Sequence, residues 1–279
     1  MNAHAHLAGL SSKERMKQIR AFDVAEDAFA LWFLGQNGFI LKSPAGTLVA
    51  IDPYLTDSCG EKHKDLPFSL ARVLPIFIDP EDLDVDAIVF THSHADHLDE
   101  ATLKRLTKVP TLIGPWEALH YAQQWSLHSE AMLELHPHQT LAFRELLLEG
   151  TFAIPTDNTD LNHIGVLFTL PSGLTFYNTG DTAYAPALER LLPRQVDVCA
   201  ICINGAFQNL SASEAAMLIK AIQPRVAIPT HYDMMACNLA DPESFRIALL
   251  HHSSDAIYHR MTYDEAFIYR REEGFPCAS

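Results

Sequence analysis

The sequence predicts an α/β fold in which two β-sheets pack face to face and helices cover both outer sides, giving four layers. Three observations predict it. Short apolar runs rich in β-branched residues alternate with runs of helical periodicity, the two halves of the chain repeat this order, and no Pro-, Gly- or Ser-rich linker separates the halves. Two facing sheets would bury both sets of apolar strands in one core. We therefore expect a single domain over residues 21–279, preceded by a loose N-terminal leader at residues 1–20.

The first half begins with two runs of strand-forming residues. They cover residues 31–42 and 47–55, and the turn sequence SPAG between them predicts a hairpin. Residues 85–90, VDAIVF, form a continuously apolar run that is typical of a strand buried on both faces. The segments expected next are a helix at 98–106, a strand at 109–115 and a helix at 116–125.

The second half repeats this order. Two of its helices carry start signals: Ser211 and Glu214 form a capping box, and Asp241 precedes Pro242 at the first helical position. The helices are expected at 185–192, 211–222 and 241–252, and the strands at 150–156, 164–170, 174–180, 196–204 and 225–230.

Composition limits the classes of function. The chain has 35 acidic against 20 basic residues, a formal net charge of −15, which disfavours a nucleic-acid or membrane-surface partner. The N-terminus lacks the pattern of a secretory signal, and no apolar run reaches the roughly 18 residues of a membrane span. Five scattered cysteines favour a reducing, cytoplasmic location, and Cys199 and Cys202 lie in an apolar run typical of core residues. An apolar stretch at 66–77 is compatible with an interface between copies of the chain, so a homo-oligomer stays an alternative.

The residues FTHSHADHLDE, 90–100, concentrate histidines and acids directly after the strand expected at 85–90. The motif H-x-H-x-D-H places His92, His94, Asp96 and His97 in the loop between that strand and a helix. Two more candidates also follow expected strands, and these are Asp181 and His231. Because α/β sheets place their ligand sites at the carboxyl ends of strands, we expect these side chains to converge.

This set of side chains suits divalent metal ions. Two histidines spaced by two on an extended loop can aim at one cation, and the adjacent Asp96–His97 pair can reach a second. Imidazoles and carboxylates suit zinc, manganese or iron. Two cations about 3.5–4 Å apart would lower the pKa of a shared water from 15.7 towards about 7 and polarise the group under attack. The motif therefore predicts two divalent metal ions and a hydrolase that uses a metal-bound hydroxide.

The motif THSHADHLD after an apolar strand resembles the signature of the metallo-β-lactamase superfamily, which implies its αββα sandwich. The similarity is closest to the branch of metal-dependent hydrolases that contains the L-ascorbate-6-phosphate lactonases. The runs that carry this similarity, in this order, are WFLGQNGFILK (32–42), IDPYL (51–55), GDT (180–182), and VAIPTHYD with NLADPESF (226–245). The resemblance implies a small-molecule substrate that is an ester, a lactone or a phosphoester, with a phosphorylated sugar-acid lactone as one candidate.

The same resemblance implies roles for individual residues. His92 and His94 would bind the first metal, and Asp96, His97 and His231 the second, with Asp181 bridging the two. Asp96 would also act in catalysis, by orienting the nucleophile or carrying a proton.

One position departs from the family pattern. Asn158 aligns where a histidine usually supplies the third ligand of the first metal. Asp157 or His163 are the candidates to replace it, and a weak first site is the alternative.

Four further residues are candidates for contact with the substrate. Asn204 ends an expected strand on the side of the site, and Tyr232 adjoins His231. Glycines flank Gln36 and Asn37, which favours a turn or bulge there and leaves a ligand contact as the alternative.

Two other functions remain open from the sequence. A phosphodiesterase acting on RNA or phospholipid would use the same metals, although the acidic charge weighs against it. A metal or ligand sensor with a degenerate site would explain Asn158.

Overall fold

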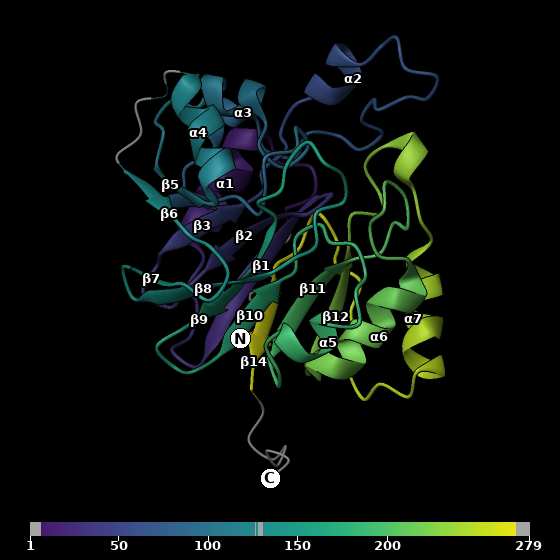
Figure 1. The fold of residues 1–279 in the computed structure, drawn as a ribbon. Coiled ribbons are helices and arrows are strands. Elements are labelled where there is room, and N and C mark those ends of the chain that lie inside the picture. The colour runs from purple at the N-terminus through teal and green to yellow at the C-terminus, as the bar shows by residue number, and fades with distance from the viewer. Residues whose placement is uncertain (1–6, 126, 128–130, 272–279) are drawn as a thin grey trace.

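The computed structural model describes residues 7–125, 127 and 131–271, which form two seven-stranded sheets (Figure 1). The first sheet has the strand order β14 (Phe267–Arg270), β1 (Ala28–Gly35), β2 (Gly38–Lys42), β3 (Leu48–Ile51), β4 (Ala87–Val89), β5 (Thr111–Gly114) and β6 (Met132–Glu134). The second has the order β13 (Ile257–Tyr258), β12 (Val226–Thr230), β11 (Val198–Cys202), β10 (Thr175–Asn178), β9 (Ile164–Thr169), β8 (Leu146–Phe152) and β7 (Thr140–Phe143).

Helices cover the outer side of each sheet, so the predicted four-layer fold is confirmed. The first sheet carries α1 (Ser12–Ala21), α3 (Glu100–Arg105) and α4 (Trp116–Gln124) on one side of the molecule, and the second carries α5 (Leu188–Leu191), α6 (Ala212–Ile222) and α7 (Pro242–His251) on the other (Figure 1). The remaining short elements are α2 (Ser58–Lys62) and the 3₁₀ turns η1 (Pro80–Asp82) and η2 (Ala236–Asn238).

Three apolar layers hold these elements together. The central one is formed by side chains of both sheets, such as Phe29, Phe39 and Phe176. One outer layer joins the first sheet to α1, α3 and α4, and the other joins the second sheet to α5, α6 and α7. Burial of apolar area in these layers is the main term that stabilises the arrangement.

Several local expectations are confirmed. The capping box of Ser211 and Glu214 is formed at the start of α6, and the Asp241 side chain accepts a hydrogen bond at the start of α7. Cys199 and Cys202 are both buried on β11. Within the described residues, no helix is both long enough and apolar enough to span a bilayer.

The run at 31–42 is two strands and not one. β1 and β2 pair with each other, and Gln36 and Asn37 form the turn between them, with an irregular register near Gly35. Gly35 has φ +87°, and a Cβ there would lie 2.6 Å from Cε of Met234. A residue without a side chain is therefore required where the chain reverses.

The expectation of a loose leader at residues 1–20 is wrong from residue 7 onward. Ser11 and Glu14 form a capping box, and α1 buries Met16 and Ile19 against the first sheet. Buried Lys42 donates through Nζ to the carbonyl of Ile19 at 3.0 Å, near the helix end where a cation is favoured. Helix α1 is thus part of the outer apolar layer, and residues 1–6 lie outside the described residues.

Candidate metal centre

The residues of the centre lie where strands of both sheets end. His92 to His97 follow β4, Asp181 follows β10 and His231 follows β12. The structure therefore brings together the residues that the sequence singled out, because parallel strands of a sheet deliver their following loops to one edge.

The first group contains His92, His94 and His163, whose ligand atoms lie within 4.8 Å of one another. The His92 and His163 ring centroids are 4.0 Å apart, and those of His92 and His94 are 4.5 Å apart. Of the two candidates for the third position, the buried His163 thus joins the histidine pair.

Asp157 lies at the outer side of His94. Its Oδ1 is 3.4 Å from Nε2 of His94, but its side chain is 44% exposed and accepts hydrogen bonds from Thr159. Asn158, the position that departs from the family pattern, is exposed. This loop therefore contributes to the group through His163, five residues beyond Asn158.

The second group contains Asp96, His97 and His231, and Asp181 adjoins it. The four distances that join their facing atoms are 3.7 Å for His97–Asp96, 3.3 Å for His231–Asp96, 3.5 Å for His97–Asp181 and 3.2 Å for His231–Asp181. Four ligands arranged tetrahedrally at ~2.1 Å from a zinc ion are about 3.4 Å apart. The distances between these side chains therefore match those between ligands of one metal ion.

Asp181 also belongs to a group with His92 and His97, which places it between the first and second groups. The backbone conformation of the preceding residue, Gly180, allows Asp181 to lie between the two groups. Gly180 has φ +60°, and a Cβ there would lie 2.8 Å from the Ile164 carbonyl oxygen and 2.8 Å from Cβ of Thr91. Only glycine tolerates both the left-handed backbone and this close packing.

Hydrogen bonds fix the tautomers of three histidines. Nδ1 of His97 faces Oδ2 of Asp52 at 2.8 Å, and Nδ1 of His163 faces the carbonyl oxygen of Asp181 at 3.2 Å. The Thr91 hydroxyl donates to Asp52, so it accepts from Nδ1 of His92, 3.0 Å away. Each ring therefore carries its proton on Nδ1 and keeps a lone pair on Nε2, as metal-binding histidines do.

These lone pairs have no hydrogen-bond partner among the residues that the structure describes. Nε2 of His92, His97 and His163 and Oδ1 of Asp181 are all buried and unpartnered. Buried polar atoms are normally satisfied, because an unmade hydrogen bond costs about 1–3 kcal/mol. Convergent acceptors without donors are what a divalent cation satisfies, so the residues present fit a metal centre.

The pKa values differ between the two groups. Burial, together with the neighbouring imidazoles, lowers the pKa of His92, and burial also lowers the pKa of His163. Burial alone would lower the pKa of His231 as well, but Asp181 and Asp96 outweigh it and raise the pKa to about 9. Carboxylates likewise overcome burial at His97 and raise its pKa.

Asp52 is a supporting residue of the candidate site that the sequence motifs did not indicate. Its side chain is fully buried and bonds His97, Thr91 and Asn37. One signal could have found it, because Asp52 directly follows β3 at the same edge as the other candidates.

Asn209 and Asn238 are two further supporting residues that the sequence did not indicate, and Asn204 adjoins Asn238. Asn209 donates to Oδ2 of Asp181 at 2.6 Å, and Nδ2 of Asn238 lies 3.0 Å from Nδ1 of His231. Asn204 donates to Oδ1 of Asn238 at 2.5 Å. Asn204 is thus linked to His231 through Asn238, and its predicted contact with substrate stays a prediction.

Tyr232 packs in the outer apolar layer with Phe245 and Leu249, and its ring lies beside Arg260. None of its described contacts reaches the two histidine groups, so its predicted contact with substrate also stays a prediction.

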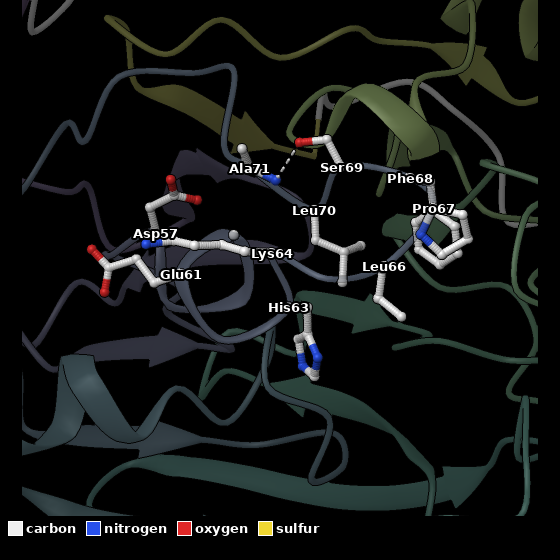
Figure 2. Close-up of a pocket in the computed structure, with 11 residues that line it drawn as sticks. Asp57, Glu61, His63, Lys64, Leu66, Pro67, Phe68, Ser69, Leu70 and Ala71 are labelled. Atoms are coloured by element: carbon white, nitrogen blue, oxygen red, sulfur yellow. Dashed lines mark hydrogen bonds between the residues drawn. The ribbon is translucent and has the colours of Figure 1, made fainter.

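Two hollows lie near these loops. One, of about 250 Å³, reaches His94 and is lined by Lys62, Ser93, His94, Ala95, Leu98, Glu100, Tyr121, Trp125 and Thr159. The other, of about 570 Å³, is lined by residues 57–71 alone; Figure 2 shows Asp57 and Glu61 on one side of it and Leu66 and Phe68 on the other. The first hollow therefore borders the first group at His94.

Comparison with known proteins agrees with this geometry. The family model described as a beta-lactamase superfamily domain matches residues 30–231. The chain belongs to the beta-lactamase superfamily. A UPF0173 metal-dependent hydrolase of Thermoplasma acidophilum is 26% identical over 71% of this chain and 81% of its own length. A probable L-ascorbate-6-phosphate lactonase of Escherichia fergusonii is 23% identical over 83% of this chain and 77% of its own length.

Two solved structures of hydrolases share the fold. A metallo hydrolase of Ignicoccus hospitalis superposes with a TM-score of 0.69 at 19% identity, covering 88% of this chain and all of its own. An isothiocyanate hydrolase from Delia radicum gut bacteria reaches the same TM-score at 18% identity, over 86% of this chain and 99% of its own. At these identities the likeness establishes the architecture alone.

Proposed function

We propose that the protein is a metal-dependent hydrolase that binds two divalent cations. The observation that carries the proposal is the set of unpartnered Nε2 atoms on His92, His97 and His163, each turned inward by a hydrogen bond at Nδ1. A scaffold that fixes three tautomers and leaves three buried lone pairs convergent is built for metal ligation.

The chain offers a ligand set for each cation. His92, His94 and His163 would hold the first, and Asp96, His97 and His231 the second, with Asp181 between them. Zinc, manganese and iron all suit such ligands. Bound cations at this place would acidify water and polarise a carbonyl or phosphoryl oxygen.

Asp96 is the proposed catalytic residue. Its side chain is 19% exposed, whereas the side chains of His97 and Asp181 are 0% and 6% exposed. It is therefore placed to meet both the cation and an incoming molecule, and to orient a water or carry its proton.

The proposed substrate is a small ester, lactone or phosphoester. The hollow beside His94 has the size of a small molecule, and Lys62 is the only lysine or arginine among the residues that line it. A phosphate group could pair with Lys62. The relative named as a probable L-ascorbate-6-phosphate lactonase supports a phosphorylated sugar-acid lactone as the first compound to test.

We further propose a cytoplasmic protein, on the five scattered cysteines, and no nucleic-acid or membrane partner, on the net charge of −15. The apolar side chains of Leu66, Phe68, Val73 and Ile76 are exposed, so self-association through this loop is an option that sedimentation would test.

The first experiment is elemental analysis of the purified protein, followed by an activity screen with lactones, esters and phosphodiesters. We expect close to two metals per chain and hydrolysis of a lactone or ester that chelation abolishes. His163→Ala should lose metal, while exposed His251→Ala should not. A phosphodiester turned over much faster than any lactone would favour the phosphodiesterase. A well-folded, metal-poor protein that hydrolyses nothing would favour the sensor.

A further inference from the structure

The turn between β1 and β2 is bonded directly to the second group. The backbone N–H of His231 donates to the Gln36 carbonyl oxygen at 2.7 Å, and the N–H of Gln36 donates to Oδ1 of Asp233 at 3.0 Å. Asp233 in turn accepts from the Tyr263 hydroxyl. Two hydrogen bonds of the Gln36 backbone, to His231 and to Asp233, therefore hold Gln36 against His231, although 195 residues separate them.

Both partners have an unfavourable backbone conformation. Gln36 has φ 57° and His231 has φ 58°, in the left-handed region that residues other than glycine rarely adopt. Such conformations persist where the surrounding structure imposes them, and they concentrate at functional sites. Here they point the two side chains at the same place.

The Gln36 side chain lies among the facing atoms of the second group. Its Nε2 is 2.7 Å from Oδ2 of Asp96 and 3.0 Å from Nε2 of His231, and these two atoms are themselves 3.3 Å apart. The residue is 1% exposed, and its Oε1 is buried without a hydrogen-bond partner. The carboxamide of Gln36 is thus held through Nε2 and not through Oε1.

We propose that Gln36 is an oxygen ligand of the second cation. Neighbouring ligands in a five- or six-coordinate shell at ~2.1 Å are about 3.0 Å apart, which matches the distances from the amide to Asp96 and His231. In the structure Nε2 of Gln36 donates to Asp96. A half-turn of the carboxamide about its Cγ–Cδ bond would place Oε1 there instead, which gives up that hydrogen bond and costs none at Oε1, since Oε1 has no partner within the described residues.

The proposed ligand changes the metal preference of the second group. Asp96 and Asp181 already supply carboxylate oxygens, and an amide oxygen from Gln36 would make the shell richer in oxygen. Such shells suit manganese or ferrous iron, whereas zinc favours four ligands. With Gln36 as a ligand, the second group would therefore favour manganese or ferrous iron over zinc.

This inference rests on the proposed function, and its test separates the two. Metal-stripped protein is titrated with Mn²⁺ by calorimetry. The wild type should bind two cations, and Gln36→Leu should weaken one of them about 10–100-fold while the other is unchanged. Gln36→Glu, which restores an oxygen, should return the affinity to within a few-fold of the wild type. Substitution with Co²⁺ gives a second readout, because absorption of the second cation should intensify in Gln36→Leu as its coordination number falls.

Gln223→Leu is the matched control, since Gln223 has φ 55° and is exposed at the end of α6. It imposes the same change on a left-handed backbone and should bind Mn²⁺ like the wild type. If Gln36→Leu also binds two cations with unchanged affinity and spectrum, Gln36 is not a ligand. If Gln36→Leu weakens binding and Gln36→Glu does not restore it, the amide acts as an N–H donor to Asp96 and the assignment is wrong. A wild type that takes up fewer than two cations overturns the proposed function itself.

Discussion

Nδ1 of His97 lies 2.8 Å from Oδ2 of Asp52, and both side chains are fully buried. The carboxylate accepts the Nδ1 proton, so Nε2 of His97 is left as an acceptor that faces Asp96 and Asp181. His97 stands in both groups that include Asp96 or Asp181. The orientation of the His97 ring therefore affects the second group and its contact with Asp181.

Replacement of Asp52 by Asn should weaken metal binding without removing a ligand. The amide can present its N–H to Nδ1, which would favour the wrong tautomer of His97. Loss of such a supporting carboxylate typically costs 10–100-fold in metal affinity, and we expect about that loss by calorimetry. Asp197→Asn is the control: Asp197 is equally buried but bonds Arg271 and Thr175. An equal loss of affinity in both variants would mean that the effect is general destabilisation.

Substitutions at His163 and Asp157 should differ in their effect on the first cation. His163→Ala removes a buried member of the first group and should lower the metal content by about one per chain. Asp157→Ala removes an exposed carboxylate that touches His94 only at 3.4 Å, so a few-fold loss of affinity at most is expected. Elemental analysis after dialysis measures both, and a larger loss in Asp157→Ala would make Asp157 the ligand.

The candidate site could be located from the sequence because its proposed ligands follow the ends of recognisable strands. The H-x-H-x-D-H motif after VDAIVF marks the edge, and Asp181 and His231 follow β10 and β12 in the same way. These residues can be predicted because each one directly follows a strand, and local apolar patterns in the sequence indicate where the strands end.

The supporting residues could not be found in this way. Asn209 and Asn238 are common loop residues, and their contacts with Asp181 and His231 follow from the approach of separate loops. Gln36 resembles an ordinary turn residue between two glycines, yet its side chain reaches a residue 60 positions away, Asp96. No spacing in the sequence encodes such a pairing.

Helix α1 should contribute to stability and not to the metal centre. Met16 is 3% exposed and packs in the outer apolar layer of the first sheet. Met16→Ala should cost about 2–5 kcal/mol of the free energy of unfolding, as expected for a buried methionine. Exposed Lys17→Ala, on the same helix, is the control and should be nearly neutral. Urea unfolding measures both, and a neutral Met16→Ala would contradict the docking of α1.

The two cations should depend differently on pH. Burial lowers the pKa of His92 and His163, so these rings are already neutral at pH 7 and need lose no proton to bind the first cation. Burial alone would lower the pKa of His231, but Asp181 and Asp96 raise it to about 9, so this ring carries a proton at pH 7 that the second cation must displace. Its affinity should therefore rise from about pH 7 to about pH 9, by about tenfold per pH unit for each proton displaced, and then level off. Calorimetry in two buffers of different ionisation enthalpy counts these protons, and exposed His251→Ala should leave the count unchanged. Equal pH dependence of both binding events would show that the carboxylates do not hold protons on the second group.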